Sequence, residues 1–80
     1  MKSMQVANLA DLHPGQSGVI QAIQAEELLH HRLQALGFRL GKKVEVIRHS
    51  KFAGPIQVRI GTTEVMMRLR EARLIHITPQ

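Results

Sequence analysis

Apolar and polar residues recur with two different periods along the chain, and each change of period marks a predicted element. Between residues 25 and 36, apolar side chains return near every fourth position, which is typical of a helix that buries one face. Short segments rich in Val and Ile and bounded by turn residues predict strands at 18–24, 43–49, 55–60, 63–69 and 74–78. The pattern therefore predicts five strands, with one helix inserted after the first.

The predicted helix carries a signal at each end. Glu26 and Glu27 in its first turn suit the positive end of the helix dipole, and Gly37 stands where a left-handed residue would end the helix. The apolar stripe is expected to consist of Ala25, Leu29, Leu33 and Leu36. Ahead of the first strand, residues 9–16 end in a Pro-Gly pair, which predicts a lead-in segment followed by a turn.

The strands at 55–60 and 63–69 form a hairpin whose register can be derived from the sequence. The loop Gly61-Thr62 has glycine at its first position, which suits a type II′ turn. The pairs that follow match apolar with apolar and charge with opposite charge: Ile60 with Thr63, Val58 with Val65, Ile56 with Met67, Arg59 with Glu64 and Gln57 with Met66. A slip of one residue would reverse the facing of a whole strand, so this agreement selects the register.

The preceding strand is less regular, because Val46 and Ile47 are adjacent and both apolar, which predicts a bulge or sharp bend there. A short sheet that bends strongly can curl around one small core. We therefore expect a mainly β fold, a small five-stranded SH3-like or OB-like barrel with one inserted helix. Eighty residues leave room for a single domain over residues 1–80.

The composition of the chain excludes several classes of protein. The absence of cysteine excludes disulfides and thiolate metal sites and favours a reducing compartment. Residues 1–6 lack the apolar run of a signal peptide, and no window approaches the roughly 20 apolar residues that span a bilayer. These features predict a cytoplasmic protein without membrane insertion.

No residue pattern predicts catalysis or a bound cofactor. Neither His30 nor His31 has a histidine three or four positions away, so a helical metal chelate is not formed. The chain also lacks a thiol nucleophile, has one aspartate, and contains no phosphate-binding loop. We expect no enzyme and no catalytic, cofactor-binding or metal site, and the sequence leaves open whether any histidine binds metal weakly.

The formal charge of +5 leaves one alternative function open, a basic small barrel that binds RNA or DNA. Such barrels stack bases on aromatic side chains, but this chain has only two phenylalanines, and its basic residues are scattered over several elements. Nucleic acid is therefore the weaker alternative. Steep loss of binding with salt would distinguish it from binding to a protein.

Two blocks, residues 29–46 and residues 55–77, together with 9–15 carry a family resemblance. They contain an Arg-Leu pair on the helix, Leu-Gly at its end, a Pro-Ile strand and Glu-Ala before the last strand. Over nearly the whole chain this resembles the FeoA family. One position departs from the family pattern, since the turn reads Leu40-Gly41 in place of Pro-Gly but keeps the glycine that the geometry needs.

The resemblance implies an SH3-like domain of the bacterial cytosol that assists FeoB, a ferrous iron permease with a cytosolic GTPase domain. The domain would bind that GTPase domain or another cytosolic part of the permease. It would act there as a regulator or an assembly factor. Similar domains also occur at the C-terminus of iron-dependent repressors, but no helix-turn-helix pattern precedes this one. The residues matching the family pattern are expected to define the fold: Arg32, Leu33, Gly37, Gly41, Pro55, Gly61 and Ala72.

Four loop residues are the candidate partner-binding surface: Phe38, Arg39, Lys51 and Phe52. Exposed aromatic and arginine side chains often anchor protein interfaces. In the alternative interpretation, the two phenylalanines close the ends of the barrel. The sequence leaves open the oligomeric state and whether the domain stimulates or restrains GTP hydrolysis by the transporter.

Overall fold

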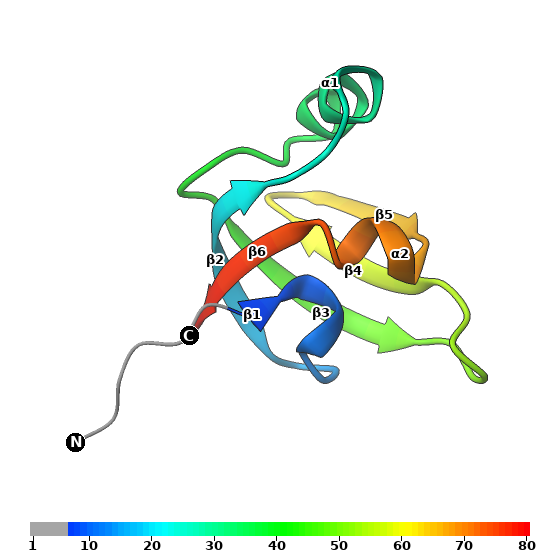
Figure 1. Ribbon diagram of the computed structural model, residues 1–80. Coiled ribbons are helices and arrows are strands. Elements are labelled where there is room, and N and C mark those ends of the chain that lie inside the picture. The colour runs from blue at the N-terminus through cyan, green and yellow to red at the C-terminus, as the bar shows by residue number, and fades with distance from the viewer. Residues whose placement is uncertain (1–6) are drawn as a thin grey trace.

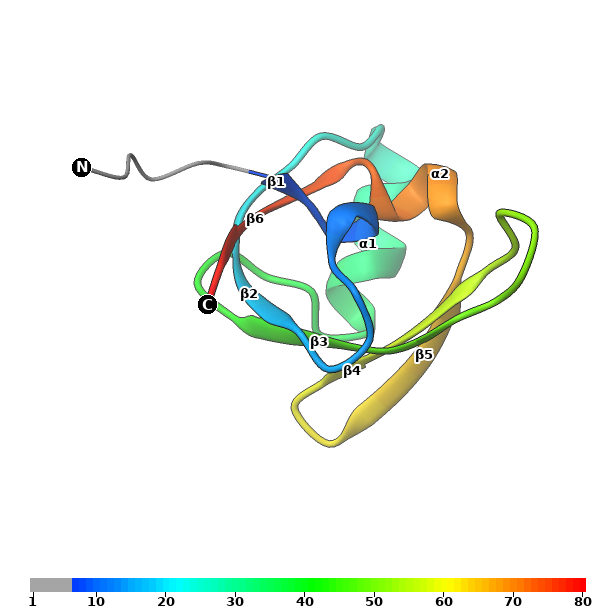
Figure 2. The same cartoon turned by 90° about the horizontal axis from the view of Figure 1, so that it is seen from below.

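The computed structural model describes residues 7–80, which form a six-stranded antiparallel sheet in the order β1-β6-β2-β3-β4-β5. The strands are β1 (Ala7–Asn8), β2 (Ser17–Ile23), β3 (Lys43–His49), β4 (Ile56–Ile60), β5 (Thr63–Met67) and β6 (Ile75–Pro79). Three helices accompany them: the 3-10 turn η1 (Leu9–Asp11), α1 (Glu27–Ala35) and the single turn α2 (Leu69–Ala72). The sheet is strongly curved, with α1 at one end of it (Figures 1 and 2).

The expected mainly β class with one inserted helix is confirmed, and each of the five expected strands is present. The sixth strand, β1, was not predicted, because two residues are too few to show a period; it pairs Ala7 with Ile77 of β6. The strand expected at 63–69 is wrong at its end. β5 stops at Met67, and α2 follows because Glu71 accepts a hydrogen bond from the backbone N–H of Arg68 at 3.2 Å, which caps the new turn.

The expected β4–β5 hairpin is confirmed in all five pairs, from Ile56 opposite Met67 to Ile60 opposite Thr63. Gly61 has φ 62°, the left-handed value that the first position of a type II′ turn requires. The expected irregularity in the preceding strand is also confirmed. Between β3 and β4 the register shifts from Val46 to Arg48, so Ile47 occupies a bulge.

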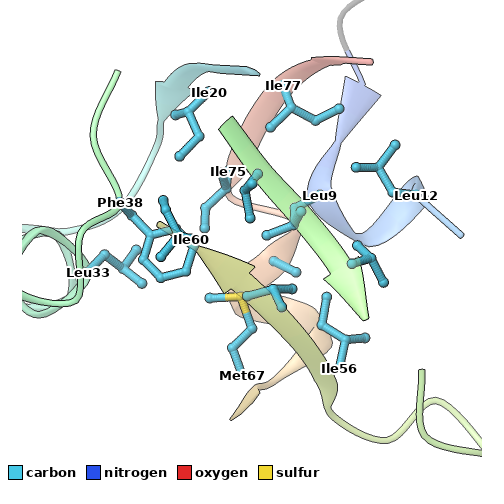
Figure 3. Packing of buried hydrophobic residues seen from close by; sticks show 14 residues of the cluster. Leu9, Leu12, Ile20, Leu33, Phe38, Ile56, Ile60, Met67, Ile75 and Ile77 are labelled. Atoms are coloured by element: carbon cyan, nitrogen blue, oxygen red, sulfur yellow. The ribbon is translucent and has the colours of Figure 1, made fainter. Parts of the chain in front are cut away.

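The core lies inside the curl of the sheet and is closed at one end by α1. Phe38 is its largest fully buried side chain, and Figure 3 shows it beside Leu33 of α1 and Ile60 of β4. The backbone explains this position: Gly37 has φ 106° and ends α1, so the chain turns and carries Phe38 inward. The other buried apolar side chains are Leu9, Leu12, Ile20, Val44, Val46, Ile56, Val58, Met67, Ala72, Ile75 and Ile77.

The residues expected to define the fold lie at junctions of this architecture. Arg32 of α1 forms an ion pair with Glu71 of α2 at 3.1 Å, joining two helices that are far apart in the sequence. Gly41 has φ 86° in the turn before β3, which agrees with the need for glycine there. Ala72 is fully buried, and Pro55 directly precedes β4. That these residues define the fold stays a prediction.

Residues 1–6, where the sequence argued against a signal peptide, lie outside the described residues. Within residues 7–80, α1 and α2 are both too short to cross a bilayer as a helix.

Candidate functional site

The structure does not place the four sequence-predicted contact residues on one surface. Phe38 was expected to be an exposed anchor, and this is wrong, because its side chain is 0% exposed. Its burial agrees with the alternative in which a phenylalanine closes one end of the barrel. Arg39 is exposed but precedes β3, whereas Lys51 follows the end of that strand. The two segments therefore lie at opposite ends of β3 (Figure 1).

Phe52 is the one candidate aromatic that the fold exposes, with 99% of its surface accessible. It lies at the tip of the β3–β4 loop, where Phe52 and Ala53 have φ values of 59° and 60°. Non-glycine residues rarely adopt this left-handed conformation, which costs about 1 kcal/mol or more per residue. The loop is closed by hydrogen bonds from Ser50 N to Pro55 O at 3.0 Å and from Gly54 N to Lys51 O at 3.2 Å. The backbone thus holds Phe52 outward.

Three adjoining hollows form a longer surface, which we call the α1–α2 groove. One of about 570 Å³ lies between α1 and β5, one of about 470 Å³ between α1 and α2, and one of about 420 Å³ between α2 and the β3–β4 loop. Arg70 lines all three of them. The full lining is Glu26, Leu28, Leu29, Arg32, Leu33, Leu36, Ala53, Gly54, Pro55, Val65, Met66, Met67, Arg68, Leu69, Arg70, Glu71, Arg73 and Leu74.

Exposed apolar side chains gather at this groove. In the described part of the chain, five large apolar side chains are exposed, and three of them line it: Leu28 (78%), Leu36 (38%) and Met66 (54%). Phe52 projects from the loop whose Ala53 and Gly54 form one end of the groove. Exposed apolar residues that cluster next to polar ones are typical of protein-binding surfaces.

The groove also carries an excess of positive charge. Four arginines line it (Arg32, Arg68, Arg70 and Arg73) against two glutamates, Glu26 and Glu71. Glu71 is already engaged, because it pairs with Arg32 and accepts the Arg68 backbone N–H. Among residues 7–80, Arg68, Arg70 and Arg73 form no ion pair with an acidic side chain. The groove therefore favours a partner that brings negative charge.

On the face beside the groove, charged side chains of β4 and β5 pair with one another. Arg59 donates to Glu64 at 2.7 Å, and Gln57 donates to the same carboxylate at 2.8 Å. These hydrogen bonds, first that from Arg59, hold the pKa of Glu64 below its ordinary value. The hydrogen bond to Glu64 likewise raises the pKa of Arg59. Both groups stay charged near neutral pH, so the pair is close to neutral as a unit.

The histidines of the described residues do not form a metal site. No group of three histidine, aspartate or glutamate side chains there is placed to hold a metal ion. His49 Nε2 lies 2.7 Å from the carbonyl oxygen of Leu12, which makes that nitrogen the donor, and His76 Nε2 lies 3.0 Å from Gln24 Oε1. These two rings therefore tie loops and strands together.

Sequence reasoning missed the groove, although it had individual clues. Met66 was assigned to the outer face of the hairpin, opposite Gln57, where an apolar side chain has no core to enter. Arg68 was placed in the strand expected at 63–69, which concealed that it directly precedes a helical turn containing Arg70.

One family model and several solved structures match this chain. A family model described as the FeoA domain matches residues 7–79. An iron uptake regulatory protein (FeoA) matches with a TM-score of 0.86 and 20% identity, over 95% of this chain and 100% of that chain. The FeoA protein of Chlorobium tepidum matches with a TM-score of 0.83 and 30% identity, over 89% and 68%.

The FeoA of Stenotrophomonas maltophilia, solved in complex with zinc, is described as a procaryotic SH3 domain protein; it matches with a TM-score of 0.79 and 25% identity, over 91% of this chain and 94% of that chain. None of the curated protein sequences matches the chain. The SH3-like architecture expected from the sequence is thus confirmed.

Proposed function

Since this chain belongs to the FeoA family, whose non-enzymatic accessory domains are associated with ferrous iron transport, we propose that it docks on a transporter of the FeoB type through the α1–α2 groove. In this proposal the protein acts in the cytoplasm, and the partner surface is the GTPase domain or another cytosolic part of the permease. The S. maltophilia relative, suggested by its description to be a ferrous iron transport activating factor, supports a regulatory role.

One observation carries the choice of surface. Leu28, Leu36 and Met66 are exposed together around arginines that lack acidic partners among the described residues. Binding of a partner would remove this apolar surface from water at about 25 cal/mol per Å² and satisfy the arginines at the same time. Phe52, exposed at one end of the groove, adds an aromatic anchor.

The alternative, binding of RNA or DNA, has less support. Phe38 is buried, so Phe52 is the single aromatic side chain left to stack on a base. The apolar side chains of the groove would gain nothing from a phosphate backbone.

Two exposed leucines provide a matched test of this surface. Leu36 lines the groove, whereas Leu40, 66% exposed, lies outside it. We expect Leu36→Asp to abolish retention of the transporter by the immobilised protein from detergent-solubilised membranes, and Leu40→Asp to retain as much as wild type. Both substitutions add the same charge, but Leu36 is only 38% exposed and is the C-cap of α1, where a negative charge opposes the helix dipole, so circular dichroism must first show that both variants are folded. Equal retention by the two variants, or recovery of ribonucleoprotein in place of the transporter, would refute the proposal.

A further inference from the structure

β5 is the last strand of the sheet, and one of its edges faces the α1–α2 groove. In a two-residue hairpin the residues flanking the loop exchange both backbone hydrogen bonds, and the pattern then alternates. Because Ile60 pairs with Thr63, the backbone groups of Thr63, Val65 and Met67 point toward β4. Those of Glu64 and Met66 therefore point away from it, and within residues 7–80 no backbone bond outside the ladder reaches either residue.

We propose that the partner enters as an extended acidic segment that pairs with this free edge of β5 and adds a seventh strand to the sheet. The proposal rests on the proposed function and specifies the form of the partner. Unpaired N–H and C=O groups along an edge are a template for another strand, and main-chain pairing of this kind is a recurring mode of peptide recognition.

The hollow beside the edge fits the side chains of such a strand. Between α1 and β5 it measures about 570 Å³, and its lining is mixed: the apolar residues Leu33, Leu36, Pro55, Val65, Met66 and Met67 lie beside the charged residues Arg32, Arg68, Arg70 and Glu71. Alternate residues of a strand point to opposite faces. Every second side chain of the added strand would therefore face this hollow, while the others would lie on the outer face beside Met66.

The positive charges at the hollow favour an acidic segment as the added strand. Arg68 directly follows β5, and Arg70 is exposed on α2, both at the same end of the hollow. The carboxylate of Glu64 does not oppose this, since Arg59 and Gln57 already hold it on the outer face. A second copy of this chain is disfavoured as the occupant, because each copy carries a formal charge of +5.

Pairing of an acidic strand with the edge of β5 can be tested without the transporter. The probes are two synthetic peptides in which valine alternates with glutamate or, as the control, with lysine. Amide hydrogen exchange of the full chain would be followed by NMR with each peptide in millimolar excess. We expect exchange at Glu64 and Met66 to slow at least about tenfold with the glutamate peptide and to stay unchanged with the lysine peptide. Unchanged exchange with both peptides, or equal slowing with both, would overturn the proposal, as would a change of sedimentation to a dimer.

A pair of variants tests the same edge in the transporter complex. Met66→Pro removes the outward N–H and blocks an approaching strand, while a proline at such an edge position leaves the ladder to β4 intact. Met66→Ala keeps the N–H and removes the side chain. We expect Met66→Pro to weaken binding to the purified cytosolic part of the transporter at least about tenfold more than Met66→Ala, with unchanged circular dichroism.

The two proposals fail in different ways. If wild type binds the transporter and Met66→Pro binds as well as Met66→Ala does, edge pairing is wrong and the docking function stands. If wild type does not bind the transporter, the docking function is wrong, and the peptide measurement alone decides whether the edge accepts an acidic strand.

Discussion

Replacing Phe38 by alanine is expected to lower the free energy of unfolding by about 3–5 kcal/mol. The side chain is fully buried beside Leu33 and Ile60, so its removal leaves a cavity where α1 closes the curl of the sheet (Figure 3). A domain of this size has a total stability of roughly 4–12 kcal/mol, so the substitution would remove at least about a quarter of it. The chain contains neither Trp nor Tyr, so urea unfolding should be followed by circular dichroism.

Phe52→Ala is the matched control for this prediction, because it removes the same side chain from a loop position that is 99% exposed. We expect its free energy of unfolding to stay within about 0.5 kcal/mol of wild type. Equal losses for the two variants would mean that Phe52 packs against the protein, contrary to the geometry of its loop.

Reversing the charge of Arg70 is expected to weaken binding to the cytosolic part of the transporter by about thirtyfold, equivalent to about 2 kcal/mol. Arg70 lines all three hollows of the α1–α2 groove and pairs with no acidic side chain in residues 7–80, so Arg70→Glu would oppose an acidic partner at the centre of the contact. Titration calorimetry at two salt concentrations measures the effect.

Arg39→Glu provides the control, since it changes the net charge by the same amount at an exposed position outside the groove. Long-range attraction falls equally in both variants, so a difference between them reports local contact. We expect Arg39→Glu to bind within about threefold of wild type, because charges at the edge of an interface or beyond it contribute little. A larger loss at Arg39 than at Arg70 would move the docking surface to the turn before β3, which holds one of the two loop segments that the sequence predicted.

Most of the fold could be predicted because its signals are local. The β4–β5 register follows from the alternation of Ile56, Val58 and Ile60 and from the glycine of the loop. The bulge at Ile47 follows from two adjacent apolar residues. In contrast, β1 has two residues and α2 has four, which is too short for either period to appear. These elements form because neighbours distant in the sequence, β6 for β1 and the cap at Glu71 for α2, stabilise them.

The candidate site could not be derived from the sequence for a related reason. The groove forms where α1 meets β5 and α2, about 30 residues further along the chain, and no local pattern reports that meeting. Phe38 and Phe52 also look alike in the sequence, since both stand in loops beside basic residues. Only the backbone separates them: a left-handed Gly37 directs Phe38 inward, whereas left-handed Phe52 and Ala53 hold the second ring in water.

Transfer of NMR saturation to methyl groups tests most directly whether the α1–α2 groove is the docking surface. The protein would carry labelled Leu and Met methyl groups, and the cytosolic part of the transporter would be irradiated in the complex. We predict loss of signal at Leu36 and Met66, which line the groove, and none at Leu40, which is more exposed than Leu36 but lies outside it. Loss at Leu40 with full signal at Leu36 and Met66 would contradict the account.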